Sequence, residues 1–374
     1  MIISAPGKLF IAGEWAILEP GNPGIVAAID RRAYVKIEKS RDDKIHIKIE
    51  NFNTEDLVAE FKKGGLRFQN RLTKEKQKKL SFIKSAIEIA LRYLGKWRPF
   101  EIEADTREMS LKTNNKRQEI GLGSSAAIVV AAIAGILNFH GINIKRQEIK
   151  NKIYKLSTIA HYFSQGEVGS GFDVAASTFG GIFLYKRFDQ NWLQRQIRKN
   201  KSVREIINLR WPGFYFENLR IPQDFNLIVA WTGESASTSL MVRKLYKWRD
   251  GNKRVFKKLS NKIGLLVKKL TRVWEIGDKE KIIKLVRLNE DYLRKLGEKS
   301  KLNIETKLLK RISEIANRYE AAGKLSGAGG GDCGIAITFD KKTLARIKKE
   351  WKENGIYIID TDISFDGVRR ENQI

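Results

Sequence analysis

The stretch Gly121-Leu122-Gly123-Ser124-Ser125-Ala126-Ala127 decides the fold. It stands directly before an apolar, alanine-rich segment, residues 128–139, whose composition predicts a helix. Glycine lets the backbone approach a ligand closely, and the first N–H groups of a helix have no partner inside it. Together with the helix dipole, these groups form a binding site for phosphate. Ser124 and Ser125 can also bind a metal ion, or they can simply cap the helix with no ligand present.

A second glycine-rich stretch, residues 326–334, reads Ser-Gly-Ala-Gly-Gly-Gly-Asp-Cys-Gly and precedes the strand-like residues 335–339. So many glycines are unfavourable in chain entropy unless the backbone needs unusual angles or close approach. Neither stretch fits a dinucleotide-binding fingerprint, because this one leads into a strand and the first follows the polar residues 112–119. A P-loop is excluded as well, since every Gly-Lys pair is followed by Leu or Trp instead of Ser or Thr.

Three motifs in this order resemble the kinase superfamily named after galactokinase, homoserine kinase, mevalonate kinase and phosphomevalonate kinase. The opening residues 5–15, Ala-Pro-Gly-Lys-Leu-Phe-Ile-Ala-Gly-Glu-Trp, are similar to its first motif. Residues 121–127 are similar to its phosphate loop, and residues 324–334 to its third motif. The resemblance spans nearly the whole chain and implies an ATP-dependent phosphotransferase that uses Mg²⁺.

The resemblance also implies a two-domain α+β fold. Residues 1–221 would form a ribosomal-S5-like domain that binds the nucleotide and carries the catalytic residues. Residues 222–374 would form a ferredoxin-like domain that completes the substrate cleft. The mixture of strand and helix patterns along the chain independently favours an α+β protein.

Within the superfamily, the chain is most similar to the bacterial and fungal branch that acts on phosphomevalonate. Residues 14–21, 169–177 and 231–239 carry this similarity. It implies that the small-molecule substrate is 5-phosphomevalonate and the product 5-diphosphomevalonate, in the mevalonate pathway of isoprenoid synthesis. The last stretch lacks a lysine often found in that branch, and Glu234 stands nearby. Mevalonate or a sugar as the acceptor is the alternative within the same class of kinases.

The resemblance assigns catalytic roles to Asp173 and Lys8. Asp173 would accept or orient the proton of the acceptor, and Lys8 would lie beside the acceptor and the transferred group. Phosphomevalonate presents a phosphate in place of an alcohol, so Asp173 is expected to act mainly through orientation. From the residues alone, an aspartate before an apolar run such as residues 174–176 is more typical of a helix N-cap.

The remaining site residues follow from the same motifs. The nucleotide phosphates are expected on Gly121, Leu122, Gly123, Ser124, Ser125 and Ala126, with Mg²⁺ on Ser124 or Ser125. The expected substrate contacts are Lys8, Glu14, Ser170, Gly171, Ser235, Ser237, Thr238, Ser239, Gly327, Ala328, Gly329 and Gly330. The hydroxyls of residues 235–239 can instead cap the helix that follows them.

One position departs from mevalonate kinase, in which a glutamate earlier in the chain than the aspartate binds magnesium. The corresponding region here holds His161, Tyr162 and Phe163, and the nearest carboxylate is that of Glu167. Because few other metal-type side chains are near in sequence, we interpret His161 as a supporting polar residue and not as a ligand.

The net charge of +28, from 71 Lys and Arg against 43 Asp and Glu, suggests nucleic acid, an anionic surface or anionic small substrates as partners. A basic nucleic-acid-binding protein is therefore the alternative from a different class. The basic runs, residues 71–79 and 195–204, lack regular aromatic interleaving, so we expect only weak, non-specific nucleic-acid binding.

Cys333 is the only cysteine, which excludes an internal disulfide and is typical of a cytoplasmic protein. With three histidines and no Cys/His spacing, neither a zinc site nor a catalytic cysteine is expected. The sequence shows no membrane span and no signal peptide. We expect a cytoplasmic monomer or homodimer.

The patterns predict strands at residues 25–38, 44–50, 100–104, 180–185, 225–231, 335–339 and 356–359, after a short strand and turn at residues 1–7. They predict helices at residues 80–94, 126–139, 146–162, 252–276, 279–296, 304–321 and 341–354, and another beginning at residue 235.

Overall fold

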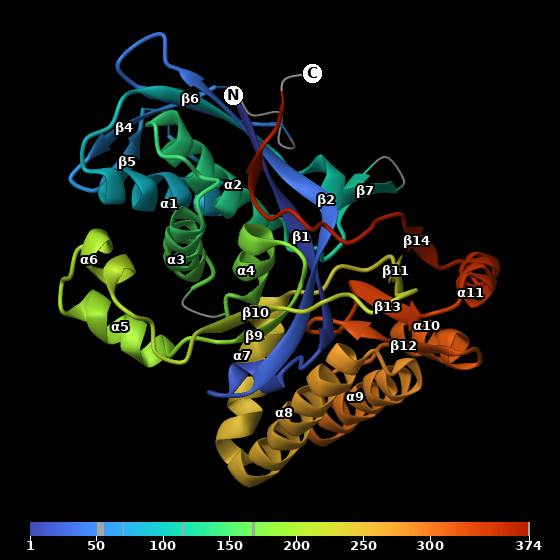
Figure 1. The fold of residues 1–374 in the computed structure, drawn as a ribbon. Coiled ribbons are helices and arrows are strands. Elements are labelled where there is room, and N and C mark those ends of the chain that lie inside the picture. The colour runs from blue at the N-terminus through green and yellow to red at the C-terminus, as the bar shows by residue number, and fades with distance from the viewer. Residues whose placement is uncertain (51–55, 70, 114–115, 167–168, 373–374) are drawn as a thin grey trace.

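The computed structural model describes residues 1–50, 56–69, 71–113, 116–166 and 169–372 (Figure 1). Its strands form a nine-stranded sheet, a four-stranded sheet and a separate hairpin, with helices packed on both large sheets. The α+β prediction is confirmed.

The nine-stranded sheet has the order β10-β9-β2-β6-β3-β4-β5, with β1 paired to β2 and β15 paired to β1. Its pairings are antiparallel except for β3 with β6, which is parallel. Its strands are β1 (Ile2–Ala12), β2 (Pro23–Lys39), β3 (Ile45–Ile49), β4 (Leu57–Lys62), β5 (Gly65–Phe68), β6 (Phe100–Asp105), β9 (Ile182–Lys186), β10 (Tyr215–Asn218) and β15 (Arg369–Arg370).

The four-stranded sheet has the order β12-β13-β11-β14 and is antiparallel. Its strands are β11 (Asn226–Trp231), β12 (Ala321–Ser326), β13 (Cys333–Thr338) and β14 (Tyr357–Ile359). The hairpin consists of β7 (Ser110–Thr113) and β8 (Lys116–Glu119).

The helices fall into two groups along the chain. Those of the first half of the chain are α1 (Lys74–Leu94), α2 (Ser124–Phe139), α3 (Gln147–Ser164), α4 (Phe172–Phe179), α5 (Gln190–Arg198) and α6 (Val203–Asn208), with short 3-10 turns at Ala16–Leu18 and Arg107–Met109. Those of the second half are α7 (Thr238–Gly251), α8 (Lys253–Ile276), α9 (Lys279–Ser300), α10 (Lys307–Asn317) and α11 (Lys341–Glu353). Helix α8 of the second group also packs on β2 of the first sheet. No helix in the described ranges is both long and apolar enough to cross a bilayer.

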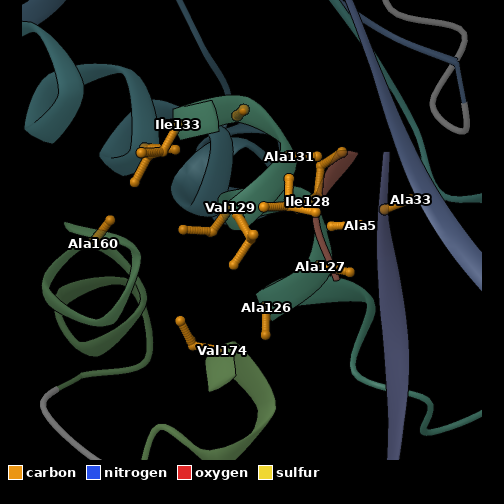
Figure 2. Packing of buried hydrophobic residues seen from close by; sticks show 14 of the residues in the cluster. Ala5, Ala33, Ala126, Ala127, Ile128, Val129, Ala131, Ile133, Ala160 and Val174 are labelled. Atoms are coloured by element: carbon orange, nitrogen blue, oxygen red, sulfur yellow. The ribbon is translucent and has the colours of Figure 1, made fainter. Parts of the chain in front are cut away.

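Helix α2 lies at the centre of the first half of the molecule. It is apolar on all sides, so it is buried between β1 and β2 and the helices α1, α3 and α4. Figure 2 shows Val129 of α2 in the space between Ala160 of α3 and Val174 of α4. A Cβ at Gly135 would lie 2.7 Å from Cδ1 of Ile37, so this glycine lets β2 approach the helix. The phosphate loop is therefore attached to a helix that the core holds on every side.

Several predicted elements differ from the structure. The helix predicted at residues 304–321 is α10, which begins after the Thr306 cap and ends at Asn317. Residue 321, the last of the predicted helix, is instead the first residue of β12, which pairs with β13 along its whole length. The helix predicted from residue 235 begins at Thr238, since the Ser237 side chain caps it there.

The start of the chain and the region before the phosphate loop also differ. The opening strand β1 extends beyond the predicted turn to Ala12, with a register shift between Pro6 and Gly7 that accommodates the proline. Residues 116–119, predicted to be non-strand, form β8, while residues 114–115 lie outside the described residues. Because β8 belongs to an antiparallel hairpin apart from the main sheets, the stretch still does not form a dinucleotide-binding unit.

After β14 the chain returns to the first sheet. Ile363 bridges to Ile29, Ser364 N donates to the Ala28 carbonyl at 2.9 Å, and β15 pairs with β1. Figure 1 shows this red segment running beside β1. The domain boundary near residue 221 stays a prediction, but residues 360–372 pack on the sheet of the first half.

The buried side chain of Arg32 fastens this returning segment. Its guanidinium donates to the Gly367 carbonyl at 2.7 Å, to Ser364 Oγ at 2.8 Å and to Ser4 Oγ at 2.7 Å. Burial lowers the pKa of Arg32 to about 10, which leaves it charged at neutral pH.

We expect Arg32→Met to lower the free energy of unfolding by about 3 kcal/mol, because it leaves several buried acceptors without a donor. Urea denaturation measures the change, and the exposed Arg67, changed to Met, is the matched control. Equal stability of the two variants would show that the Arg32 contacts do not hold the C-terminal segment.

Candidate functional site

A cavity lies where the two halves of the molecule meet, and segments distant in sequence form its wall. They are β1, the loop that follows it, the phosphate loop, the start of α4, the start of α7 and the third-motif glycine loop. The charged side chains that line it are Lys8, Glu14, Glu119, Asp173 and Asp332. The cavity thus joins all three motifs singled out in the sequence.

The phosphate loop has the geometry of an anion site. Gly123 is the N-cap of α2 with φ +85°, and no side chain caps the helix, so the capping alternative for Ser124 and Ser125 is wrong. Among the described residues, none accepts a hydrogen bond from the backbone N–H of Ser124 or Ser125. These N–H groups are available at the cavity wall, which both serine side chains also line.

Lys8 is attached to this loop at two points. Its backbone N–H donates to the Leu122 carbonyl at 2.8 Å, and its Nζ donates to the Gly121 carbonyl at 2.7 Å. A Cβ at Gly123 would lie 3.0 Å from Cγ of Lys8, so the glycine leaves room for the lysine stem. The ammonium is therefore held at the edge of the phosphate site, where it can neutralise developing negative charge.

Asp173 lies inside the first turn of α4, and Gly171, in the left-handed region, is the N-cap. The alternative of an N-cap aspartate is therefore wrong. Asp173 Oδ1 accepts from Val174 N at 2.9 Å, and its second oxygen lies 3.9 Å from Nε2 of His161. The carboxylate stays 16 % exposed and faces the cavity.

His161 connects Asp173 to the phosphate loop. Its Nε2 lies 3.1 Å from Ser125 Oγ, and Phe82 stacks on its ring with centroids 5.4 Å apart. Burial lowers the pKa of His161, which favours the neutral imidazole, while the Asp173 charge opposes this shift. His161 thus orients Ser125 and lies close to Asp173.

Two further carboxylates at the cavity, those of Glu119 and Asp332, were not expected. Asp332 has φ +55° and accepts from Ala236 N at 3.0 Å, and burial raises its pKa. Partial desolvation, and then the Asp332 charge, raise the pKa of Glu119. In the sequence, only the position of Asp332 beside the glycines of the third motif indicates that this residue belongs to the site.

The oxygen groups near the loop suit Mg²⁺, which binds hard ligands and keeps several water or phosphate oxygens. Ser124, Ser125 and Asp173 supply such groups at one wall of the cavity. The described residues contain no cluster of three or more His, Cys, Asp or Glu that could hold a metal alone. The site therefore fits an ion carried mainly by nucleotide phosphates and not one enclosed by the protein.

The expected substrate residues fall into two groups. Glu14, Ser170, Ser235, Thr238, Gly327 and Ala328 line the cavity. Gly171, Ser237, Ser239, Gly329 and Gly330 lie within two positions of lining residues but are absent from the cavity wall that the structure describes.

Local contacts explain these placements. The Ser237 side chain caps α7, as the capping alternative predicted, and the Gly330 N–H donates to the Ile304 carbonyl at 2.8 Å. Ser235 Oγ donates to the Glu119 carbonyl at 2.6 Å and so joins α7 to the phosphate-loop region. Ser170 is buried, and its carbonyl accepts from Tyr185 OH at 2.6 Å.

Glu14 lines the cavity but directs its carboxylate into the interior, where it pairs with Lys324. Cys333 is also interior: its thiol donates to the Ile120 carbonyl at 2.9 Å, and burial raises its pKa far above the usual range. A buried, protonated thiol is a poor nucleophile, in agreement with the expectation that Cys333 is not catalytic. Glu167 lies outside the described residues.

Comparison with known proteins agrees with this site. The profile of the GHMP kinases N terminal domain matches residues 81–181, and that of the GHMP kinases C terminal region matches residues 266–356. Phosphomevalonate kinase from Streptomyces sp. (strain CL190) is 30% identical over 382 residues, covering 97% of each chain. Mevalonate kinase from Thermococcus sibiricus is 27% identical over 373 residues, covering 100% of this chain and 98% of that protein.

A solved structure has the same fold over the same length. Streptococcus pneumoniae phosphomevalonate kinase in complex with phosphomevalonate and AMPPNP superposes with a TM-score of 0.81 at 26% identity, covering 97% of this chain and 99% of that one. The profiles, the full-length relatives and the three motifs around one cavity lead to the same assignment. The chain belongs to the GHMP kinase family, in which the relatives it resembles are phosphomevalonate and mevalonate kinases.

Proposed function

We propose that this protein transfers the γ-phosphoryl group of ATP to 5-phosphomevalonate, producing 5-diphosphomevalonate and ADP in isoprenoid synthesis. One observation carries the proposal: Lys8 and Asp173 line the same cavity as the free N–H groups of the phosphate loop. The relative whose structure holds phosphomevalonate and AMPPNP supports both substrates.

Phosphoryl transfer depends on positioned phosphates and neutralised charge more than on covalent chemistry. The phosphate loop would bind the nucleotide phosphates through the N–H groups of Ser124 and Ser125. The Lys8 ammonium would neutralise charge on the transferred group. Asp173, held near His161, would orient the acceptor oxygen. Mg²⁺, bound to the phosphates and to Ser124 or Ser125, would supply the remaining positive charge.

Mevalonate is the second candidate acceptor, and the charge of the cavity favours it. Among the described lining residues Lys8 is the one cation, against the carboxylates of Glu119, Asp173 and Asp332, since Glu14 is paired with Lys324 in the interior. A phosphorylated acceptor would have to rely on hydroxyl and backbone donors, such as those of Ser235 and Thr238. Mevalonate lacks the phosphate of phosphomevalonate and therefore brings one anionic group fewer into the cavity.

An ADP-release assay across phosphomevalonate, mevalonate, homoserine and galactose tests the proposal. We expect kcat/KM for phosphomevalonate to exceed that for mevalonate by at least about tenfold, because a site built around a polar group rejects analogues that lack it. ³¹P NMR of the product identifies the diphosphate. Turnover of mevalonate with none of phosphomevalonate would replace this function with that of the second candidate.

A further inference from the structure

A group of buried polar side chains lies behind the cavity wall, and nothing in the proposed chemistry uses it. We name it the buried junction: Glu14 after β1, Asn289 and Glu290 on α9, and Lys324 on β12. Their exposed fractions are 1 %, 0 %, 2 % and 0 % respectively. The junction thus joins the first motif to a helix and a strand of the second half of the chain.

The members of the junction bind one another and the backbone around them. Lys324 Nζ donates to Glu14 Oε1 and to the Leu325 carbonyl. Asn289 donates to Glu14 Oε2 at 3.1 Å and accepts from Gly13 N at 3.2 Å. Both oxygens of the Glu14 carboxylate therefore have partners inside the protein.

The charges of the junction depend on one another. Burying an ion is unfavourable by several kcal/mol unless it is paired and hydrogen-bonded. Lys324 and Glu14 satisfy this condition as a pair, while burial raises the pKa of Glu290 to about 8. Glu290 accepts from Leu325 N at 3.2 Å, next to Lys324 in β12.

The junction holds the two residues that precede a strained position. Trp15 has φ +62° and ψ −43°, which is unfavourable for a residue with a Cβ. Such a conformation persists only where the surrounding structure enforces it. Here Asn289 fixes the backbone of Gly13 and the side chain of Glu14, immediately before Trp15.

The strained segment is also a wall of the site. Trp15, Ile17 and Leu18 line the cavity together with Phe10 and Val242. This apolar wall is separate in the chain from the phosphate loop, whose N–H groups are assigned to the nucleotide. We therefore call residues 13–18 the acceptor wall.

We infer that Lys324 and Asn289 are positioning residues that act through Glu14 to hold the acceptor wall in its binding conformation. The identity of the acceptor rests on the proposed function, whereas the position of the wall does not. Loss of either residue should loosen residues 13–18 and weaken acceptor binding while leaving the nucleotide site unchanged.

Hydrogen exchange measured by mass spectrometry, combined with steady-state kinetics, tests the inference in the full-length protein. Lys324→Met and Asn289→Leu should each accelerate exchange in residues 13–18 but not in residues 119–127. Each should raise KM for the acceptor about tenfold and change KM for ATP less than about twofold, as expected for lost ground-state binding. The exposed Lys299, changed to Met, is the matched control and should behave as the unmodified protein.

If Lys324→Met fails to fold, Asn289→Leu still tests the inference, because it leaves the ion pair between Lys324 and Glu14 in place. Unchanged exchange in residues 13–18, or an equal rise of both KM values, would overturn the inference. Faster exchange without turnover of phosphomevalonate or mevalonate would support the inference and reject the proposed function.

Discussion

Asp173→Asn is expected to lower kcat by about 10³-fold without unfolding the protein, since preorganised charge at a reaction centre contributes several kcal/mol. The substitution is nearly isosteric, and the asparagine oxygen can still accept from Val174 N as Asp173 does at 2.9 Å. What disappears is the negative charge near His161, on the cavity side of α4. The effect on rate therefore reports the charge and not the packing.

Single-turnover rates measure this loss, and circular dichroism with thermal melting establishes that the fold persists. Asp250→Asn, at the exposed end of α7, is the matched control and should retain the original rate. If Asp173→Asn keeps most of its activity, the residue stabilises the start of α4 and takes no part in the reaction.

Lys8→Met is expected to lower kcat by about 10²-fold while the affinity for nucleotide changes little. Methionine preserves most of the aliphatic stem that fits beside Gly123 and removes the ammonium that donates to the Gly121 carbonyl. The ammonium matters most when negative charge develops on the transferred group, so its loss affects the transition state more than the bound state.

Calorimetric titration with a non-hydrolysable ATP analogue measures the binding, and rapid-quench kinetics measures the chemical step. Lys36→Met, an exposed side chain on β2, is the control. Much weaker nucleotide binding with a normal kcat would place the Lys8 ammonium in the nucleotide site only.

Sequence reasoning succeeded where the local sequence pattern favours the same structure that tertiary packing requires. Helix α2 is apolar on every side, and the glycines before it have the positive φ that the phosphate loop requires. The long amphipathic pattern of α8 likewise predicts a helix packed on one face. In these segments the local sequence pattern is enough to predict both the helix and which of its faces is buried.

Sequence reasoning failed where contacts between distant segments determine the structure. The alanines at the start of β12 favour a helix locally, but pairing with β13 makes them a strand. Lys324 belongs to a residue type that is almost always exposed, and only the fold brings it to Glu14. The approach of His161 to Ser125 joins residues 36 positions apart, which no spacing rule predicts.

The return of the last residues to the first sheet has a consequence for biosynthesis. A chain leaves the ribosome N-terminus first, and early domains generally fold before later ones emerge. Here Arg32 can bind Ser364 only after the 332 positions that separate the two residues have been translated. Until then the outer edge of β1 that later receives β15 is uncovered, and unpaired edges invite association with other chains. The nascent protein thus carries an open edge until residues 369–370 have been translated and pair with β1.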